Sequence, residues 1–253
     1  MDVIKELKIF YKRFKGEKGI IGYSTKKRPL YYFSIGGGEK KIIATYSIHA
    51  REYITTYLAM ETIKYLSDKK LDGKIYFIPC VNPDGVKICI KGKPLYKANY
   101  RKVDLNVNFD ADFGKGKSNL FYENDENYVG KHPFSEKETK ALRDFTKLIR
   151  PNLTLSYHSK GEEIYYSFKQ KGERLKKDFA LAKEIALLTG YEIKETPFSS
   201  GGYKDWCIDK LSIPAFTIEV GNDNLTHPIK KESLPDIFNK NKEVLTRLLE
   251  KLW

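Results

Sequence analysis

The chain contains little cysteine. Its 253 residues include three cysteines, Cys80, Cys89 and Cys207, an odd number with no Cys-x-x-Cys spacing. This pattern indicates neither a disulfide framework nor a zinc site built from thiolates. A reducing compartment fits these cysteines, and we expect the protein to be cytoplasmic.

Long hydrophobic runs are also absent. The N-terminal stretch 1–14 carries a charged residue every two or three positions, so it lacks the apolar core of a signal peptide. No apolar run elsewhere approaches the ~20 residues that a membrane-spanning helix needs. The sequence therefore predicts neither a signal peptide nor a membrane span.

Low-complexity segments, internal repeats and linkers are missing as well. Hydrophobic residues make up 41% of the chain and aromatic residues 13%, with glycine and proline scattered, which excludes a disordered or collagen-like chain. A chain of this length can bury most of its unfolded surface around one core. We therefore predict a single domain over residues 1–253.

Negative charge is in deficit. Lysine and arginine total 46 against 33 for aspartate and glutamate, which gives a net charge of +13. Such a charge attracts anionic partners such as nucleic acid, acidic lipid or an acidic substrate. The lysines are spread along the chain, a pattern typical of a solvated surface. We therefore expect no nucleic-acid partner and keep one only as a minor alternative; the oligomeric state is not predicted.

Hydrophobic periodicity predicts an α/β domain. A helical segment is expected within residues 1–20, ended by Gly19 and Gly22. Two strands are then expected at 30–35 and 42–48 with a turn between them, followed by a helix at 53–66 and a strand at 74–79.

The rest of the chain begins with a long irregular stretch at 82–130, where functional loops are expected. A capping-box pattern at 135–138 then predicts a helix to about Ile149. Further strands are expected at 153–157, 163–168 and 215–220, and helices at 175–188 and 234–252.

His49 and Glu52 are the first candidate metal ligands. They lie three positions apart after an apolar strand, where an imidazole and a carboxylate can hold one zinc ion. Of the other histidines, His132 and His227 precede prolines in polar loops and are interpreted as surface or loop-packing residues. His158 closes an apolar run, so it emerges at a strand end, where open α/β sheets build their sites. It is the best third ligand.

Glu219 lies inside an otherwise apolar β run, 216–220. A buried carboxylate without a partner costs several kcal/mol, so Glu219 forms a structural salt bridge or faces a site. The other candidate residues favour the site.

These segments, in this order, resemble the zinc carboxypeptidase superfamily from about Gly22 to Gly221. The resemblance implies one α/β domain with a mixed central β-sheet flanked by helices. Its motifs are His49-Ala-Arg-Glu52, Asn82-Pro-Asp-Gly85, Val103-Asp-Leu-Asn106, His158 and Thr217-Ile-Glu219.

The resemblance also implies roles for these residues. His49, Glu52 and His158 would bind one Zn²⁺ ion, and Glu219 would be the general base that activates water and later protonates the leaving amine. Asp104 would orient His49 from behind the metal site.

Departures from the family pattern bear on the substrate. Val107 stands where family members that trim free C-termini have an arginine for the terminal carboxylate, so bidentate recognition is lost. Lys97 stands where an arginine commonly polarises the scissile carbonyl, and it is expected to stabilise an oxyanion as a point charge; alternatively, it is one more surface lysine.

The substrate pocket is assigned by the same alignment. The family's mobile tyrosine falls at Pro197 or Phe198, so its role is not transferred. Lys204 is expected on the floor of the pocket for the residue after the cut, where a cation favours an acidic partner. The other residues expected near the substrate are Tyr203, Asn106, Arg101 and Arg51.

Several segments resemble one branch of the superfamily, the bacterial γ-D-glutamyl-L-diamino acid peptidases. The resemblance implies a zinc peptidase that hydrolyses the γ-D-glutamyl-meso-diaminopimelate bond of peptidoglycan stem peptides. Alternatives are a metallocarboxypeptidase that removes acidic C-terminal residues and a non-catalytic module that binds anionic polymers. The segments are 96–99, 133–139, 157–165 and 218–228.

Overall fold

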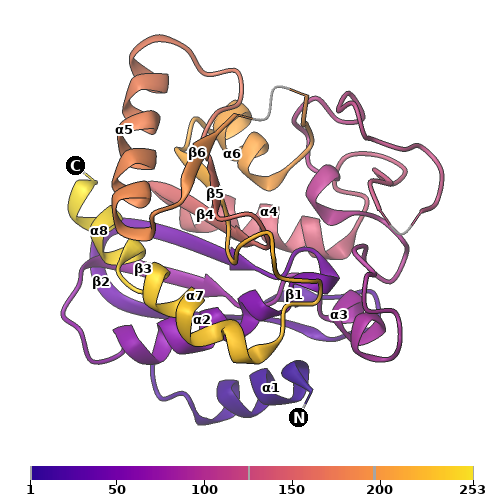
Figure 1. Cartoon of the computed structure of the whole chain (residues 1–253), viewed down its shortest axis with the longest axis horizontal. Coiled ribbons are helices and arrows are strands. Elements are labelled where there is room, and N and C mark those ends of the chain that lie inside the picture. Colours follow the sequence, from indigo (N-terminus) through magenta and orange to yellow (C-terminus); the bar gives the residue numbers. More distant parts are fainter. Residues whose placement is uncertain (1, 125, 196–197, 253) are drawn as a thin grey trace.

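The protein folds around one mixed β-sheet with helices on both faces (Figure 1). The computed structural model describes residues 2–124, 126–195 and 198–252. The strands are β1 (Lys18–Tyr23), β2 (Pro29–Tyr46), β3 (Asp72–Ile78), β4 (Leu153–His158), β5 (Glu163–Tyr165), β6 (Glu192–Lys194) and β7 (Ala215–Glu219). The helices are α1 (Val3–Arg13), α2 (Ile54–Leu66), α3 (Pro83–Ile90), α4 (Lys137–Ile149), α5 (Gly172–Thr189), α6 (Tyr203–Leu211), α7 (Leu234–Asn241) and α8 (Val244–Lys251). Short 3₁₀ turns are η1 (Ala50–Glu52), η2 (Leu105–Val107) and η3 (Lys231–Ser233).

The sheet order is β1-β2-β4-β7-β5-β6, with β3 paired to β2. Strands β2, β4 and β7 run parallel, whereas β1 and β5 pair antiparallel with their neighbours β2 and β7. Parallel neighbours end at the same edge of a sheet, so the C-terminal ends of β2, β4 and β7 lie side by side.

Strand β2 reverses direction within its length. Residues 33–36 meet β3 in descending order, from Phe77 to Lys74, and residues 42–45 meet the same strand in ascending order. The reversal includes Gly36 and Gly38, whose φ angles of 84° and 108° suit glycine. The predicted strand, turn and strand therefore occur within β2.

Two apolar clusters cover the two faces of the sheet. One joins the sheet to α1, α2, α5, α7 and α8, and the other joins it to α4 and α6. All six residues of β4 are buried, including Thr154 and Ser156, as expected for a parallel strand that is covered on both faces.

Several predicted boundaries are wrong. Helix α1 ends at Arg13, and Gly19 and Gly22 lie in β1 instead of ending a helix. The predicted irregular region contains α3, and the predicted helix 234–252 is divided into α7 and α8. The predicted capping box at 135–138 does not form: Glu136 is the N-cap residue of α4 and makes no side-chain cap, and the hydroxyl of Ser135 donates to the Glu136 carboxylate. Among the described helices, none combines the length and apolarity that a membrane crossing requires.

Candidate zinc site and active-site cavity

The candidate metal ligands come from the ends of two neighbouring strands. Tyr46 ends β2 opposite Tyr157 of β4, and these two rings stack with centroids 4.7 Å apart. His49 and Glu52 follow β2 on the turn η1, and His158 is the last residue of β4. The parallel pairing thus brings side chains more than 100 positions apart in the sequence to one edge of the sheet.

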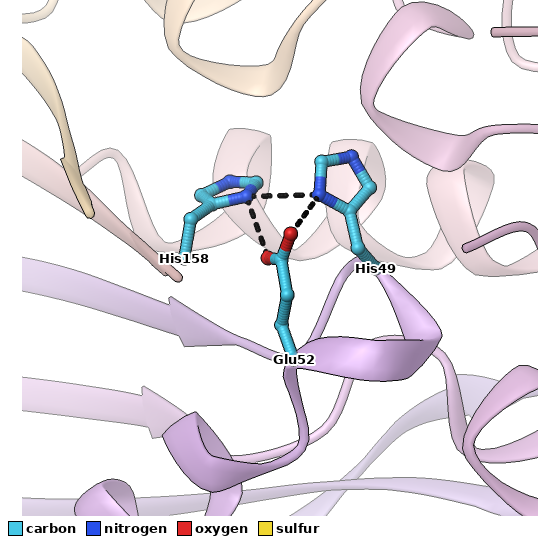
Figure 2. A group of neighbouring side chains, drawn as sticks. All are labelled: His49, Glu52 and His158. Carbon is cyan, nitrogen blue, oxygen red and sulfur yellow. Dashed lines mark hydrogen bonds and ion pairs between the residues drawn. The ribbon is translucent and has the colours of Figure 1, made fainter. Parts of the chain in front are cut away.

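The three side chains converge on one point (Figure 2). Glu52 places Oε1 2.9 Å from Nδ1 of His49 and Oε2 3.0 Å from Nδ1 of His158. The two Nδ1 atoms are 3.1 Å apart. One ligand atom from each residue lies within 4.8 Å of the others, and all three residues are buried.

The other nitrogen of each imidazole has its own partner. Nε2 of His49 lies 3.2 Å from Oδ1 of Asp104, and Nε2 of His158 lies 3.0 Å from the hydroxyl of Ser156. Partners of this kind favour a proton on Nε2, which leaves the Nδ1 lone pairs free for a metal ion.

The donor set fits a zinc ion. The buried carboxylate of Glu52 lies between the two imidazoles, with Oε1 facing His49 and Oε2 facing His158. Burial opposes ionisation of Glu52, but His49 and His158 outweigh it and lower the pKa of this carboxyl. Two imidazoles and one carboxylate are the ligands of many catalytic zinc sites.

Asp104 connects the metal site to Lys97. Its Oδ2 lies 2.7 Å from Nζ of Lys97, and its Oδ1 faces His49. Burial opposes the charge of both groups, but their mutual attraction raises the pKa of Lys97 and, together with His49, holds the pKa of Asp104 well below its usual range. Lys97 is therefore a fixed, protonated cation beside the site.

A cavity of about 380 Å³ opens beside His49, with Lys97, Asn106 and Val107 in its lining. The side-chain oxygen of Asn106 accepts a hydrogen bond from the backbone of Tyr203 at 3.1 Å, which fixes the amide in the wall. Val107 presents no charge to this space, as the sequence indicates.

Glu219 ends β7 on the strand next to His158. The two residues are directly paired in the parallel register, so their side chains leave the same face of the sheet. Burial raises the pKa of Glu219 to about 8; His158 and Lys97 oppose this shift, and Glu52 and Glu163 reinforce it. A carboxyl that exchanges a proton near neutral pH suits general acid–base chemistry.

The structure separates some predicted substrate residues from the cavity. Arg51 forms an ion pair with Glu126 and donates to the carbonyl of Leu95 at 3.3 Å. Arg101 pairs with Glu136 at 3.6 Å and lines a different depression, so the structure does not bring it to the cavity beside His49.

Two further predicted substrate residues already have partners within the protein. Tyr203 is fully buried, and its hydroxyl hydrogen-bonds Thr146 at 2.8 Å, so a substrate cannot reach it. Lys204 is buried, with Nζ 2.6 Å from Asp205 and 2.8 Å from the carbonyl of Ser167. It is not a free cation.

Of the two positions aligned with the family's tyrosine, Pro197 lies outside the described residues. Phe198 is 70% exposed and lines the cavity. Ser156 was not predicted, although the two-residue repeat of a strand places it on the same face as His158.

The comparison with protein families agrees with this geometry. Residues 15–243 match the family model described as zinc carboxypeptidase. The chain belongs to this family. The cluster of His49, Glu52 and His158 fits the zinc site of this family of zinc carboxypeptidases. The alternative of a non-catalytic binding module is therefore not retained.

Relatives within the family differ in their activities. The chain is 30% identical to γ-D-glutamyl-L-diamino acid endopeptidase 1 of Lysinibacillus sphaericus, over 91% of this chain and 66% of that protein. It is 31% identical to carboxypeptidase A4 of Mus musculus, over 79% of this chain and 56% of that protein. The chain thus spans less than two thirds of the length of either relative.

Solved structures confirm the predicted fold class. Bovine thrombin-activatable fibrinolysis inhibitor superposes with a TM-score of 0.87 at 21% identity, over 98% of this chain and 96% of that chain. The murein-tripeptide amidase MpaA of Escherichia coli O157 gives 0.69 at 22% identity, over 92% and 93%.

Proposed function

We propose that this protein hydrolyses the γ-D-glutamyl-meso-diaminopimelate bond of peptidoglycan stem peptides, and that it does so in the cytoplasm. The observation that carries the proposal is the uncharged Val107 in the wall of the cavity beside His49. A cavity without a guanidinium there lacks the bidentate grip on a terminal carboxylate. The relative from Lysinibacillus sphaericus, named for action on γ-D-glutamyl-L-diamino acid bonds, supports the same substrate class.

The proposed chemistry assigns each residue a task. A zinc ion held by His49, Glu52 and His158 would supply Lewis acidity to the scissile carbonyl. Glu219 accepts one proton from the attacking water and passes it to the leaving amine as the C–N bond breaks. Asp104 keeps the imidazole of His49 oriented, and Lys97 places positive charge where the carbonyl oxygen becomes negative.

The test is product analysis by mass spectrometry. Zinc-loaded protein is incubated with a tripeptide and a tetrapeptide stem, which reports the bond cut and the length preferred. Glu219→Gln should lower kcat by ~10²-fold or more, because it removes the general base. Glu192→Gln is the matched control, since this side chain is 71% exposed at the edge strand β6. Full activity of Glu219→Gln, or products cut at another bond, would refute the proposal.

A second candidate is a metallocarboxypeptidase that acts on acidic C-termini. It is favoured by the 31% identity to carboxypeptidase A4. This candidate requires recognition of a free terminal carboxylate. Comparison of one acidic peptide with its C-terminal amide decides between the two, because a strong preference for the free acid favours the carboxypeptidase.

A further inference from the structure

A second cavity of about 350 Å³ adjoins the cavity beside His49. Lys117, Phe198 and Ser199 line both spaces, so the two cavities meet at these residues, and together they are called the cleft. The metal ligand His49 lies in the first part, and Lys115 and Lys169 lie in the second. Lys117 therefore shares a cavity with the metal ligand His49.

The loop that carries Lys117 is hydrogen-bonded to the segment 198–201. The backbone N–H of Lys117 donates to the carbonyl of Phe198 at 3.0 Å. Ser200 donates its hydroxyl to the carbonyl of Asp112 at 2.9 Å, and the N–H of Gly201 donates to the carbonyl of Ala111 at 2.7 Å. These bonds hold Lys117 at the junction of the two cavities.

Most cations near the cleft already have an anionic partner. Lys97 pairs with Asp104, and Lys204 pairs with Asp205. Asp112 pairs with two of the three lysines that line the second cavity, Lys115 at 3.4 Å and Lys169.

Lys117 differs from these cations. Within residues 2–124, 126–195 and 198–252 it forms no ion pair, and its ammonium lies 5.8 Å from the centroid of the Phe198 ring. The side chain is exposed, so its charge is open to a ligand in the cleft.

We propose that Lys117 is a specificity-determining residue that binds a carboxylate of the residue on the leaving side of the cut. This inference rests on the proposed function for the identity of that residue. Val107 offers no charge and Lys204 is neutralised, so among the described residues that line the two cavities Lys117 is the cation without an ionic partner. meso-Diaminopimelate carries two carboxylates, one on its backbone and one on its side chain, and the shared chemistry is an ammonium–carboxylate pair.

The experiment measures binding rather than turnover. Calorimetry on the zinc-loaded Glu219→Gln protein compares L-Ala-γ-D-Glu-meso-diaminopimelate with two analogues. One analogue ends in L-lysine and lacks the side-chain carboxylate; the other is the diaminopimelate peptide amidated at its backbone carboxyl. The analogue that binds more weakly identifies which carboxylate is recognised.

Lys117→Gln in the Glu219→Gln background should weaken binding of the diaminopimelate peptide about tenfold. The protein should then bind this peptide no more tightly than the analogue that lacks the recognised carboxylate. Lys117→Arg should restore the advantage, because it keeps the charge. Lys115→Gln is the matched control on the same loop; its side chain is 75% exposed and Asp112 offsets its charge, so binding should change less than about twofold.

Three results overturn the inference: equal binding of all three peptides, discrimination that survives Lys117→Gln, or an equal loss with Lys115→Gln. Cleavage by the parent protein reports on the proposed function separately. Correct cleavage without Lys117-dependent discrimination refutes only the carboxylate site. Lys117-dependent discrimination without cleavage refutes only the proposed reaction.

Discussion

At the residue scale, the metal site depends on groups behind the ligands. One buried carboxylate, that of Asp104, contacts Nε2 of His49 through one oxygen and forms an ion pair with the ammonium of Lys97 through the other. Ser156 is a neutral partner of His158. The two imidazoles are thus oriented by partners of different charge.

We expect Asp104→Asn to lower zinc affinity by about 10- to 100-fold. The amide removes the negative charge that supports His49 and leaves the partly buried Lys97 without its counter-ion. Competition with a chromophoric chelator measures the affinity. Ser156→Ala is the comparison variant, and its loss should be smaller because the hydroxyl is uncharged. Equal losses of zinc affinity in the two variants would show that the negative charge of Asp104 does not determine the affinity.

Residue types and spacing predict the ligands better than they predict the substrate contacts. His49, Glu52 and His158 follow apolar strands, and strand pairing alone brings such positions together. Tyr203 and Arg101 contact Thr146 and Glu136, side chains distant in the sequence, so their engagement cannot be read from their neighbours. Lys204 pairs with the adjacent Asp205, and only the fold shows that both are buried. The sequence shows that a lysine is present but does not show which carboxylate neutralises it.

At the element scale, the turn before α3 supports the metal loop. Asn82 is fully buried; its amide donates to the carbonyl of Ile48 at 3.1 Å and of Ala98 at 3.0 Å, and its oxygen accepts from the N–H of Gly85. Ile48 directly precedes His49. The start of α3 therefore holds both the metal loop and the segment that carries Lys97.

Asn82→Ala should lower the free energy of unfolding by roughly 2–4 kcal/mol, because it removes a helix cap and leaves two buried carbonyls without donors. Zinc affinity should fall as well. Denaturant unfolding and a zinc titration measure the two effects. Asn152→Ala is the matched control: this amide accepts from Lys41 at an exposed position, so its removal should cost less than about 1 kcal/mol. Unchanged zinc affinity in Asn82→Ala would show that the Asn82 cap does not support the metal site.

Elements with strong periodicity are predictable, and elements that begin inside turn sequences are not. Helix α2 and strands β4 and β7 follow their apolar patterns closely. Helix α3 was missed because Asn82-Pro-Asp-Gly85 has the composition of a turn, although the same residues cap and start a helix. The break between α7 and α8 falls in a pattern that stays amphipathic, so periodicity alone does not reveal it.

At the scale of the whole molecule, a group of buried acids joins distant segments despite the net positive charge. Glu138 of α4 accepts from the N–H of Thr25 at 3.1 Å, and Asp84 of α3 accepts from that of Lys26 at 2.7 Å. Asn99 donates to Glu136 at 2.8 Å. The turn between β1 and β2, both helices and the segment after Lys97 are thereby connected.

This group predicts a pH dependence of stability. Burial raises the pKa of Glu138 to about 7 from its ordinary 4.5, and the charges of Glu136 and Asp84 reinforce the shift against the opposing backbone N–H groups of Glu138 and Thr25. The folded protein binds this proton more tightly than the unfolded chain does. Below pH 4.5 the carboxyl is protonated in both states and does not lower the free energy of unfolding. As pH rises from 4.5 to about 7, it lowers the free energy of unfolding increasingly.

Glu138→Gln removes this titration. The free energy of unfolding of the variant, minus that of the parent protein, should increase by roughly 3 kcal/mol between pH 4.5 and pH 7 and stay level above it. Urea unfolding at half-unit intervals of pH measures the difference. A constant offset from lost hydrogen bonds does not affect the result, because only the slope with pH is compared. A difference that is flat across the window, or that falls as pH rises, would mean that Glu138 is already ionised in the folded protein at low pH.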